Sequence, residues 1–400
     1  MTVPGGPPLR VLVLDHTAEL GGAELALVRT CAALRPDVDV RVLLFADGPL
    51  RAHLEDLGVR VEVVPLSPSV ATADRESAGR LSAATVTGAL RMIPFLWRLA
   101  RRVRVLRPDV VHTTSLKADL LGIVPATLSR RPLVWHVHDR IAPDYLPGPL
   151  VRVVRGLARR VPAAVVANSR ATAATLPVTT AVAYPGFAPA QAAGAEGALA
   201  ARPDVPDPVV VMVGRISPTK GQLEAVRALR TVVDAAPTAR LRVVGEPAFG
   251  AEDYAAQVRA EVTRLGLDDH VDLLGFVPDP RAELDRAAVC VHASPVPEPF
   301  GQVVVEAMVR GVPVVATRAG GVEEILDDPE AGTPSLGLLV PPGDADALAA
   351  AVLDVLLDPV AARERALRAR TAALRRFPVE RTARVLTDVW TTVSGRARRA

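Results

Sequence analysis

Residues 298–306 read Glu-Pro-Phe-Gly-Gln-Val-Val-Val-Glu, and this stretch decides which fold and which kind of site the sequence predicts. It follows a strand-like run at 288–293 and a proline-rich break, and the apolar segment after it stops at Gly-Val-Pro, residues 311–313. The pattern predicts a strand, a loop and a helix that begins near Gly301, because glycine and proline stand where helices end. In doubly wound α/β sheets, ligands bind between strand ends and helix starts.

Two carboxylates bracket this predicted helix start. Glu298 would lie in the approach loop and Glu306 one to two turns into the helix, so both can face one crevice. A free helix N-terminus favours phosphate groups. The arrangement therefore suits a nucleotide sugar, which has phosphates in the middle and hydroxyl groups at both ends. Taken singly, Glu298 could be an ordinary loop residue and Glu306 a surface ion-pair partner.

The segment Glu-Pro-Phe-Gly at 298–301, followed by Glu306, resembles the E-x7-E motif of retaining glycosyltransferases of family 4, also called glycosyl transferases group 1. The resemblance implies a GT-B architecture, with two Rossmann-like parallel-sheet domains facing a central cleft. It also implies that Glu298 contacts the sugar hydroxyls and Glu306 the ribose hydroxyls of a nucleotide-sugar donor. The residues that it places beside the donor at the helix start are Phe300, Gly301, Gln302 and Val303.

Two cations give a second signal. A strand-like run at 209–213 leads into Gly-Arg-Ile-Ser-Pro-Thr-Lys-Gly at 214–221 and then into a helical pattern. Arg215 offers a rigid fork of donors and Lys220 a point charge, both close to a helix N-terminus. The loop resembles the family's diphosphate-binding G-R-x(n)-K-G, which implies that both cations stabilise the departing diphosphate. Alone, the two side chains could be solvated residues of a surface turn.

Further short segments follow in the family's order. Gly245 ends a strand-like run where the family closes over the nucleotide, and Phe276 and Val277 resemble the segment that lies against the base. Gly-Gly at 320–321 resembles the family's Gly-Gly-x-x-Glu turn. Each is an ordinary glycine turn when taken alone, so their order and spacing carry the inference.

The first half offers a glycine pair and two histidines. Gly21 and Gly22 follow a strand-like run and open a helix, and the resemblance implies close backbone approach to a phosphate or acceptor; plain turn chemistry is the alternative. His138 ends the strand-like run 133–139 next to an acid, where the family has a catalytic-site histidine that hydrogen-bonds a donor-sugar hydroxyl. His136, two residues back on the same face of the strand, is the alternative.

Organisation and composition agree with a two-domain α/β protein. Strand-like and helical patterns alternate throughout, which predicts parallel sheets, and the alternation breaks in an Ala/Gly/Pro-rich stretch. We expect an N-terminal acceptor-side domain over 1–188, a linker over 189–208, a nucleotide-sugar-binding domain over 209–375, and a C-terminal helix over 376–400 that can pack back on the first domain. The strand-like runs of the second half are 209–213, 240–244, 271–273, 289–292, 312–316 and 337–340.

Composition excludes several classes. Only 3% of the residues are aromatic, so Val, Leu and Ala must build the core, and the net charge of +3 without interleaved aromatic residues predicts no nucleic-acid partner. Cys31 and Cys290 lie in apolar stretches and are expected as core residues in a reducing compartment. The N-terminus does not resemble a secretory signal, and no apolar window approaches 18 residues. We therefore expect a cytoplasmic protein.

Neither a metal site nor a redox cofactor is predicted. Of the two Asp-x-Asp strings, Asp344 is best interpreted as a helix N-cap, and the string at 37–39 lies in a helix-to-strand connection. Neither follows a strand, as a metal-dependent transferase requires. A G-x-G-x-x-G sequence is missing from both domain openings, which weakens a dehydrogenase interpretation.

Residues 91–107 and 152–160 are basic and apolar, and such helices can rest on anionic lipid at the inner face of a membrane. A buried helix with a basic exposed edge is the alternative, and Pro94 interrupts the first stretch. The whole pattern predicts metal-independent sugar transfer, with retention, from a UDP- or GDP-sugar to a sugar, lipid-linked or small-molecule acceptor. The alternatives are a sugar-nucleotide epimerase of the same fold and a catalytically silent binding protein.

Overall fold

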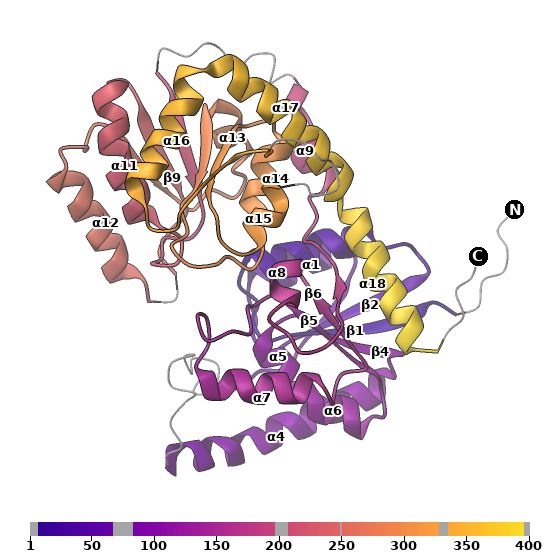
Figure 1. Ribbon diagram of the computed structural model, residues 1–400. Coiled ribbons are helices and arrows are strands. Elements are labelled where there is room, and N and C mark those ends of the chain that lie inside the picture. The colour runs from indigo at the N-terminus through magenta and orange to yellow at the C-terminus, as the bar shows by residue number, and fades with distance from the viewer. Residues whose placement is uncertain (1–6, 67–82, 197–206, 249, 328–334, 396–400) are drawn as a thin grey trace, which may run out of the picture. The chain divides into compact units, whose positions relative to one another are not determined.

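The computed structural model describes residues 7–66, 83–196, 207–248, 250–327 and 335–395, and the chain divides into two compact units (Figure 1). The first contains residues 1–186 and 379–400, and the second contains 187–378. Part of the segment expected as a linker lies in the second unit, where residues 189–192 form a short helix; residues 197–206 are outside the described part. The last described helix belongs to the first unit.

A seven-stranded parallel sheet forms the centre of the first unit, in the order β3-β2-β1-β4-β5-β6-β7. Its central strands are runs of Val and Leu that are buried on both faces, as parallel sheets require. The strands are β1 (Leu9–Asp15), β2 (Val38–Leu44), β3 (Arg60–Val63), β4 (Val110–Thr113), β5 (Leu133–Val137), β6 (Ala164–Ala167) and β7 (Ala181–Val182). The helices are α1 (Gly22–Ala33), α2 (Pro49–Asp56), α4 (Ala83–Leu106), α5 (Leu116–Leu121), α6 (Ile123–Leu128), α7 (Gly148–Ala158), α8 (Arg170–Ala173) and α18 (Val379–Val393).

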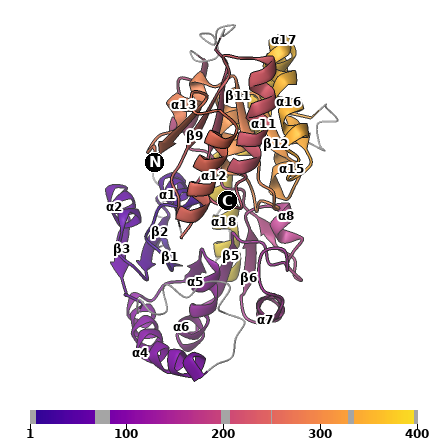
Figure 2. The ribbon, with the colours of Figure 1, turned by 90° about the vertical axis from the view of Figure 1, so that its left-hand side faces the viewer.

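Helices cover both faces of this sheet. On one face, α1, α2 and α18 bury side chains that include Leu27, Leu54 and Trp390. On the other face, α4, α6 and α7 pack with residues such as Leu99 and Val154, and Figure 2 shows these three helices gathered at one side of the unit. A six-residue α5 completes that second layer. The unit is therefore a three-layer α/β sandwich.

The basic stretch at 91–107 lies in α4 except for its last residue, and the exposed side of this helix carries apolar side chains beside its arginines, with Ile93 58% and Trp97 63% exposed. Its apolar face, which includes Phe95 and Leu99, packs on the sheet, and Pro94 lies inside the helix. Arg102 donates from Nη2 to Glu62 of β3 at 2.6 Å, so a carboxylate distant in sequence occupies one of these cations. No helix in the described part of the chain is both long and apolar enough to cross a bilayer.

The second unit contains a six-stranded parallel sheet in the order β10-β9-β8-β11-β12-β13. Its strands agree closely with the runs predicted from sequence: β8 (Val209–Val213), β9 (Arg240–Val244), β10 (Val271–Gly275), β11 (Val289–His292), β12 (Val314–Thr317) and β13 (Leu338–Val340). The helices are α9 (Pro189–Ala192), α11 (Gln222–Ala235), α12 (Glu252–Arg264), α13 (Arg281–Arg286), α14 (Gln302–Val309), α15 (Gly321–Leu326), α16 (Ala345–Leu357) and α17 (Pro359–Arg376). Asp344 caps α16 as predicted, accepting from the amide of Ala347 at 2.8 Å.

When each sheet is numbered from its own first strand, the second has the Rossmann order 3-2-1-4-5-6, and the first has the same order with a seventh strand at its edge. The side of the sheet on which successive strands are added therefore changes at β1 in the first unit and at β8 in the second. In open α/β sheets, ligands bind at such a switch point, outside the carboxyl ends of the strands, which in the second unit are the ends of β8 and β11.

Candidate functional site

The two motifs singled out in the sequence flank the switch point of the second sheet. The loop 214–221 follows β8, and the loop that carries Glu298 follows β11, the neighbour of β8. Gly221 has a φ of +82°, and a Cβ there would lie 1.9 Å from the carbonyl oxygen of Ala293. Only glycine therefore fits this position, and the close approach holds the two loops together.

Lys220 and Glu298 form a half-buried ion pair at this switch point. Nζ of Lys220 lies 2.8 Å from both carboxylate oxygens of Glu298, and the side chains are only 23% and 16% exposed. His292, the last residue of β11, has its Nε2 3.6 Å from Oε2 of Glu298. Burial raises the pKa of Glu298, but Lys220 and His292 lower it by more, so the net effect holds that pKa below its usual range. Glu298 is therefore an anion at neutral pH.

Arg215 and Lys220 share a loop but not an environment. Arg215 is exposed, whereas Lys220 turns inward toward Glu298. The fully buried side chain of Gln222 shapes the loop between them: Nε2 donates to the carbonyl of Arg215 at 2.9 Å, and Oε1 accepts from the amide of Ser217 at 3.3 Å. The loop thus holds the Arg215 side chain near the solvent and the Lys220 side chain against Glu298.

The predicted helix start is confirmed. Helix α14 begins at Gln302, and its N-cap, Gly301, has a φ of +104° with no side chain to cap the first amides. The positive end of the helix dipole at this N-terminus favours an anion. Glu298 lies in the loop before this helix and Glu306 in its second turn, as predicted. The chain therefore places two carboxylates and one helix N-terminus within one loop–helix unit.

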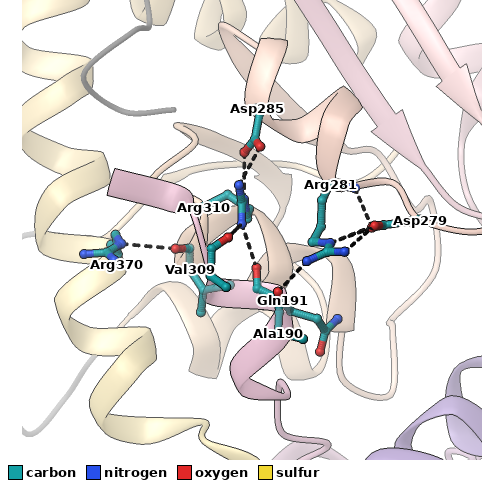
Figure 3. Close-up of polar contacts among 9 residues, drawn as sticks. Ala190, Gln191, Asp279, Arg281, Asp285, Val309, Arg310 and Arg370 are labelled. Carbon is teal, nitrogen blue, oxygen red and sulfur yellow. Dashed lines mark hydrogen bonds and ion pairs between the residues drawn. The ribbon is translucent and has the colours of Figure 1, made fainter. Parts of the chain in front are cut away.

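A contact from α9 fixes the orientation of Glu306. Gln191 donates from Nε2 to Oε1 of Glu306 at 3.0 Å. Arg310, at the end of α14, holds the backbone of the same segment by donating to the carbonyl of Gln191 at 3.1 Å and to that of Ala193 at 2.6 Å (Figure 3). Asp285 of α13 binds the other side of the Arg310 guanidinium, with Nε to Oδ1 at 2.7 Å. The segment that carries Gln191 is therefore clamped to α14.

Two further arginines strengthen this clamp (Figure 3). Arg281 donates to the carbonyl of Ala190 at 2.6 Å while it is held by Asp279, and Arg370 donates to the carbonyl of Val309 at 3.2 Å. Carbonyl groups at the ends of short helices need such partners. The backbone around Gln191 is therefore held in place by arginines of the same unit.

The remaining predicted donor residues lie at the ends of β9 and β10. The amide of Gly245 donates to the carbonyl of Gly275 at 2.8 Å, which brings the two strand ends together. Phe276, the next residue, presents a 56% exposed ring, and Val277 is half-buried beside it. An exposed aromatic side chain at a strand end is available to stack on a flat ligand.

In the first unit, the structure separates the two candidate histidines. His136 is buried within β5, and its Nε2 has no hydrogen-bond partner in the described part of the chain. His138 follows the strand and is half-buried, with its ring centroid 4.1 Å from that of His136. Burial lowers the pKa of His138 to about 4, although Asp139 and Asp15 oppose this shift. His138 is therefore a neutral imidazole directly after the strand end.

Gly21 and Gly22 open α1 as predicted, with Gly21 as the N-cap. Glu24 lies in the first turn, and burial together with the charge of Asp15 raises its pKa to about 7. A Cβ on Gly21 would lie 2.4 Å from Oε2 of Glu24, so the glycine makes room for this carboxyl. No group of three or more His, Cys, Asp or Glu residues in the described part of the chain is arranged to hold a metal ion.

Comparison with known proteins decides the family. Residues 171–374 match the family described as "Glycosyl transferases group 1", and residues 21–181 match the "Glycosyl transferase 4-like domain". The chain belongs to the glycosyl transferases group 1 family. The two Rossmann-like units are accordingly those of the GT-B fold, and the chain is a glycosyltransferase.

Similarity to members of this family extends over most of the chain. A D-inositol 3-phosphate glycosyltransferase of Kineococcus radiotolerans is 32% identical over 395 residues, which cover 90% of this chain and 88% of that protein. The Kribbella flavida protein of the same name is 28% identical over 86% of this chain and 84% of its own length. The crystal structure of Anabaena Alr3699/HepE in complex with UDP and glucose superposes with a TM-score of 0.80 at 29% identity, covering 96% of this chain and 100% of that one.

Sequence reasoning about this glycosyltransferase missed three residues of the site. His292 ends β11 and is buried. The signal in the sequence is a histidine at the end of an otherwise apolar strand-like run. Gln191 and Gln222 carried no such signal, because each acts through a partner that only the fold brings near.

Proposed function

We propose that this glycosyltransferase transfers a sugar from a nucleoside-diphosphate sugar to an acceptor, with retention of configuration and without a metal ion. The observation that carries the proposal is the arrangement of Lys220, Glu298 and Glu306 around the N-terminus of α14 at the switch point of the second sheet. Retention is inferred from the family.

In this proposal, the diphosphate binds at the N-terminus of α14, where the positive end of the helix dipole and two cations meet its charge. Lys220 has three N–H donors and directs two at Glu298, so the third can contact a phosphate oxygen without breaking the pair. Arg215, which is exposed at the mouth of the same loop, supplies a paired set of donors. As the sugar–phosphate bond breaks, these groups stabilise the charge that develops on the leaving diphosphate.

The carboxylates bind the two ends of the donor. Glu306, held by Gln191, accepts hydrogen bonds from the ribose hydroxyls. Glu298 is an anion at neutral pH and accepts from hydroxyls of the transferred sugar, and the neutral imidazole of His138 contacts that sugar from the first unit. Gly245, Phe276 and Val277 lie beside the base, and Gly21 and Gly22 approach the acceptor or a phosphate.

The relatives indicate the class of donor. HepE was crystallised with UDP-glucose, and a GDP-mannose-dependent mannosyltransferase of Mycolicibacterium smegmatis is 34% identical over 38% of this chain. We therefore propose a UDP- or GDP-sugar as donor and a sugar, a lipid-linked molecule or another small molecule as acceptor. Neither the epimerase nor the silent binding protein is favoured.

Isothermal titration with UDP and with GDP tests the donor site. We expect one of the two to bind the wild-type protein, and Glu306→Gln to weaken that binding about tenfold, because a neutral amide accepts less strongly from the ribose hydroxyls. Glu364→Gln, an exposed position on α17 of the same unit, is the matched control and should bind as wild type does. If neither nucleotide binds, or if both variants bind equally well, the assignment is wrong.

A further inference from the structure

An open pocket lined by arginines lies at the ends of α4 and α6 in the first unit. Its volume is about 610 Å³, and we call it the arginine pocket. The lining residues are Arg104, Arg107, Thr127, Leu128, Ser129, Arg130 and Arg131. The two helices pack against each other and their ends lead into the first residues of β4 and β5 (Figure 1). The pocket therefore lies beside the N-terminal ends of β4 and β5, whereas His138 follows the C-terminal end of β5.

The charge of this pocket is uncompensated. Its lining contains four arginines and no carboxylate, and none of the four forms an ion pair with any residue that the structure describes. Arg104 donates to the carbonyl of Leu128 at 2.9 Å, as expected of a basic residue near a helix C-terminus. Asp109, the acid that follows in the chain, is occupied by Arg10 at 3.1 Å. Helix capping thus accounts for one arginine and leaves three unexplained.

The backbone supplies independent evidence that these side chains are used. Within the described residues, only Arg107 and Arg130 combine a side chain with a positive φ, at +48° and +51°. Arg107 directly follows α4 and Arg130 comes two residues after the last residue of α6, and at helix ends the left-handed conformation usually belongs to glycine. Backbone strain of this kind persists mostly at functional positions. Here it occurs twice, both times at an arginine, and both times in the same pocket.

A buried hydroxyl completes the set of donors. Oγ of Ser129 is buried and has no hydrogen-bond partner among the described residues. Buried hydroxyl groups nearly always have a partner, so an orphaned one suggests a missing ligand. Guanidinium groups recognise phosphate through paired donors, and a serine hydroxyl can add one more hydrogen bond.

We propose that the arginine pocket binds a phosphate-bearing polyanion. The phosphate can be that of a free polyphosphate or that of a lipid headgroup, since Val105 and Leu128 are 58% and 51% exposed beside the pocket. Nothing in this assignment depends on the donor site.

The strained backbone makes the test sharp. Arg107→Gly/Arg130→Gly removes two cations at positions that favour glycine, so the melting temperature should change little while anion binding is lost. Arg35→Gln/Arg51→Gln removes the same charge from exposed positions elsewhere in the unit and is the matched control. All variants carry Arg215→Ala/Lys220→Met/Glu298→Gln as well, so that the donor site does not bind the probe and no unpaired carboxylate remains there.

Isothermal titration with tripolyphosphate at low salt is the first arm, and sedimentation with phosphatidylcholine vesicles that contain phosphatidic acid is the second. We expect the glycine pair to weaken binding of at least one probe by tenfold or more, whereas the glutamine pair behaves as its parent. Loss confined to tripolyphosphate indicates a free anion, and loss of vesicle binding indicates a lipid phosphate. Unchanged binding of both probes in the glycine pair overturns the proposal. If that pair proves unstable, Arg104→Gln/Arg131→Gln, at positions with ordinary backbone, repeats the test.

Discussion

Replacing Lys220 by methionine should destabilise the second unit as well as slow the reaction. Methionine keeps most of the length of the side chain but leaves the carboxylate of Glu298 in a site where that side chain is only 16% exposed. Breaking a buried ion pair from one side costs about 3–5 kcal/mol. Because both partners of this pair retain some exposure, we expect about 3 kcal/mol, the low end of that range.

The loss should depend on pH in a defined direction. The pKa of Glu298 is lowered in the folded wild-type protein, so its contribution to stability is present above the unfolded pKa of about 4.3 and disappears as the pH falls through the folded value. Without Lys220, burial dominates and raises that pKa, so the carboxyl becomes protonated more easily. The stability difference between wild type and Lys220→Met should therefore be largest at pH 7, should shrink as the pH falls toward the unfolded pKa of about 4.3, and should shrink further below it.

Urea unfolding followed by far-UV circular dichroism at pH 7 and pH 4 measures this difference. The double variant Lys220→Met/Glu298→Gln should recover most of the stability, since it removes the unpaired charge. Arg318→Met is a suitable control, because that arginine is 52% exposed and its ion pairs with Asp327 at 3.4 Å and Glu323 at 4.0 Å lie at the surface, where such pairs contribute little. Equal stability of Lys220→Met and wild type at pH 7 would show that the pair contributes nothing. If the double variant does not recover the lost stability, the cause of the loss is not the unpaired carboxylate of Glu298.

Three further predictions concern donor contacts. His138→Ala should lower turnover about tenfold, the effect of one lost hydrogen bond, and should leave the affinity for nucleoside diphosphate unchanged. Full turnover in His138→Ala together with an inactive His136→Ala would show that His136 is the histidine used. Gln191→Ala should weaken nucleoside diphosphate binding about fivefold, or about 1 kcal/mol, and reduce the penalty for a 2′-deoxy nucleotide, because Glu306 is no longer oriented; an unchanged penalty in titration calorimetry would refute this role. Arg215→Lys should lose about 10²–10³ in rate, and a chelator should have no effect; activity restored by magnesium after chelation would contradict metal independence.

The sequence predicted the parts of this molecule that depend on local pattern. The strand, glycine and apolar spacing around 298–306 predicted the start of α14 correctly, because a helix start is specified by neighbouring residues. The pairing of Lys220 with Glu298 could not be predicted, since it joins positions 78 residues apart through the register of β8 and β11. The role of the basic stretch in α4 was left open for the same reason, because Glu62 comes from a strand 40 residues away.

Release of nucleoside diphosphate from UDP-glucose and from GDP-mannose, compared between wild type and Glu306→Gln, tests the central claim most directly. The account predicts that the wild-type protein cleaves one of these donors, even slowly and with water as acceptor, and that Glu306→Gln cleaves it at least tenfold less efficiently in kcat/KM. Equal cleavage by the two proteins, or cleavage of neither donor by the wild type, would contradict it.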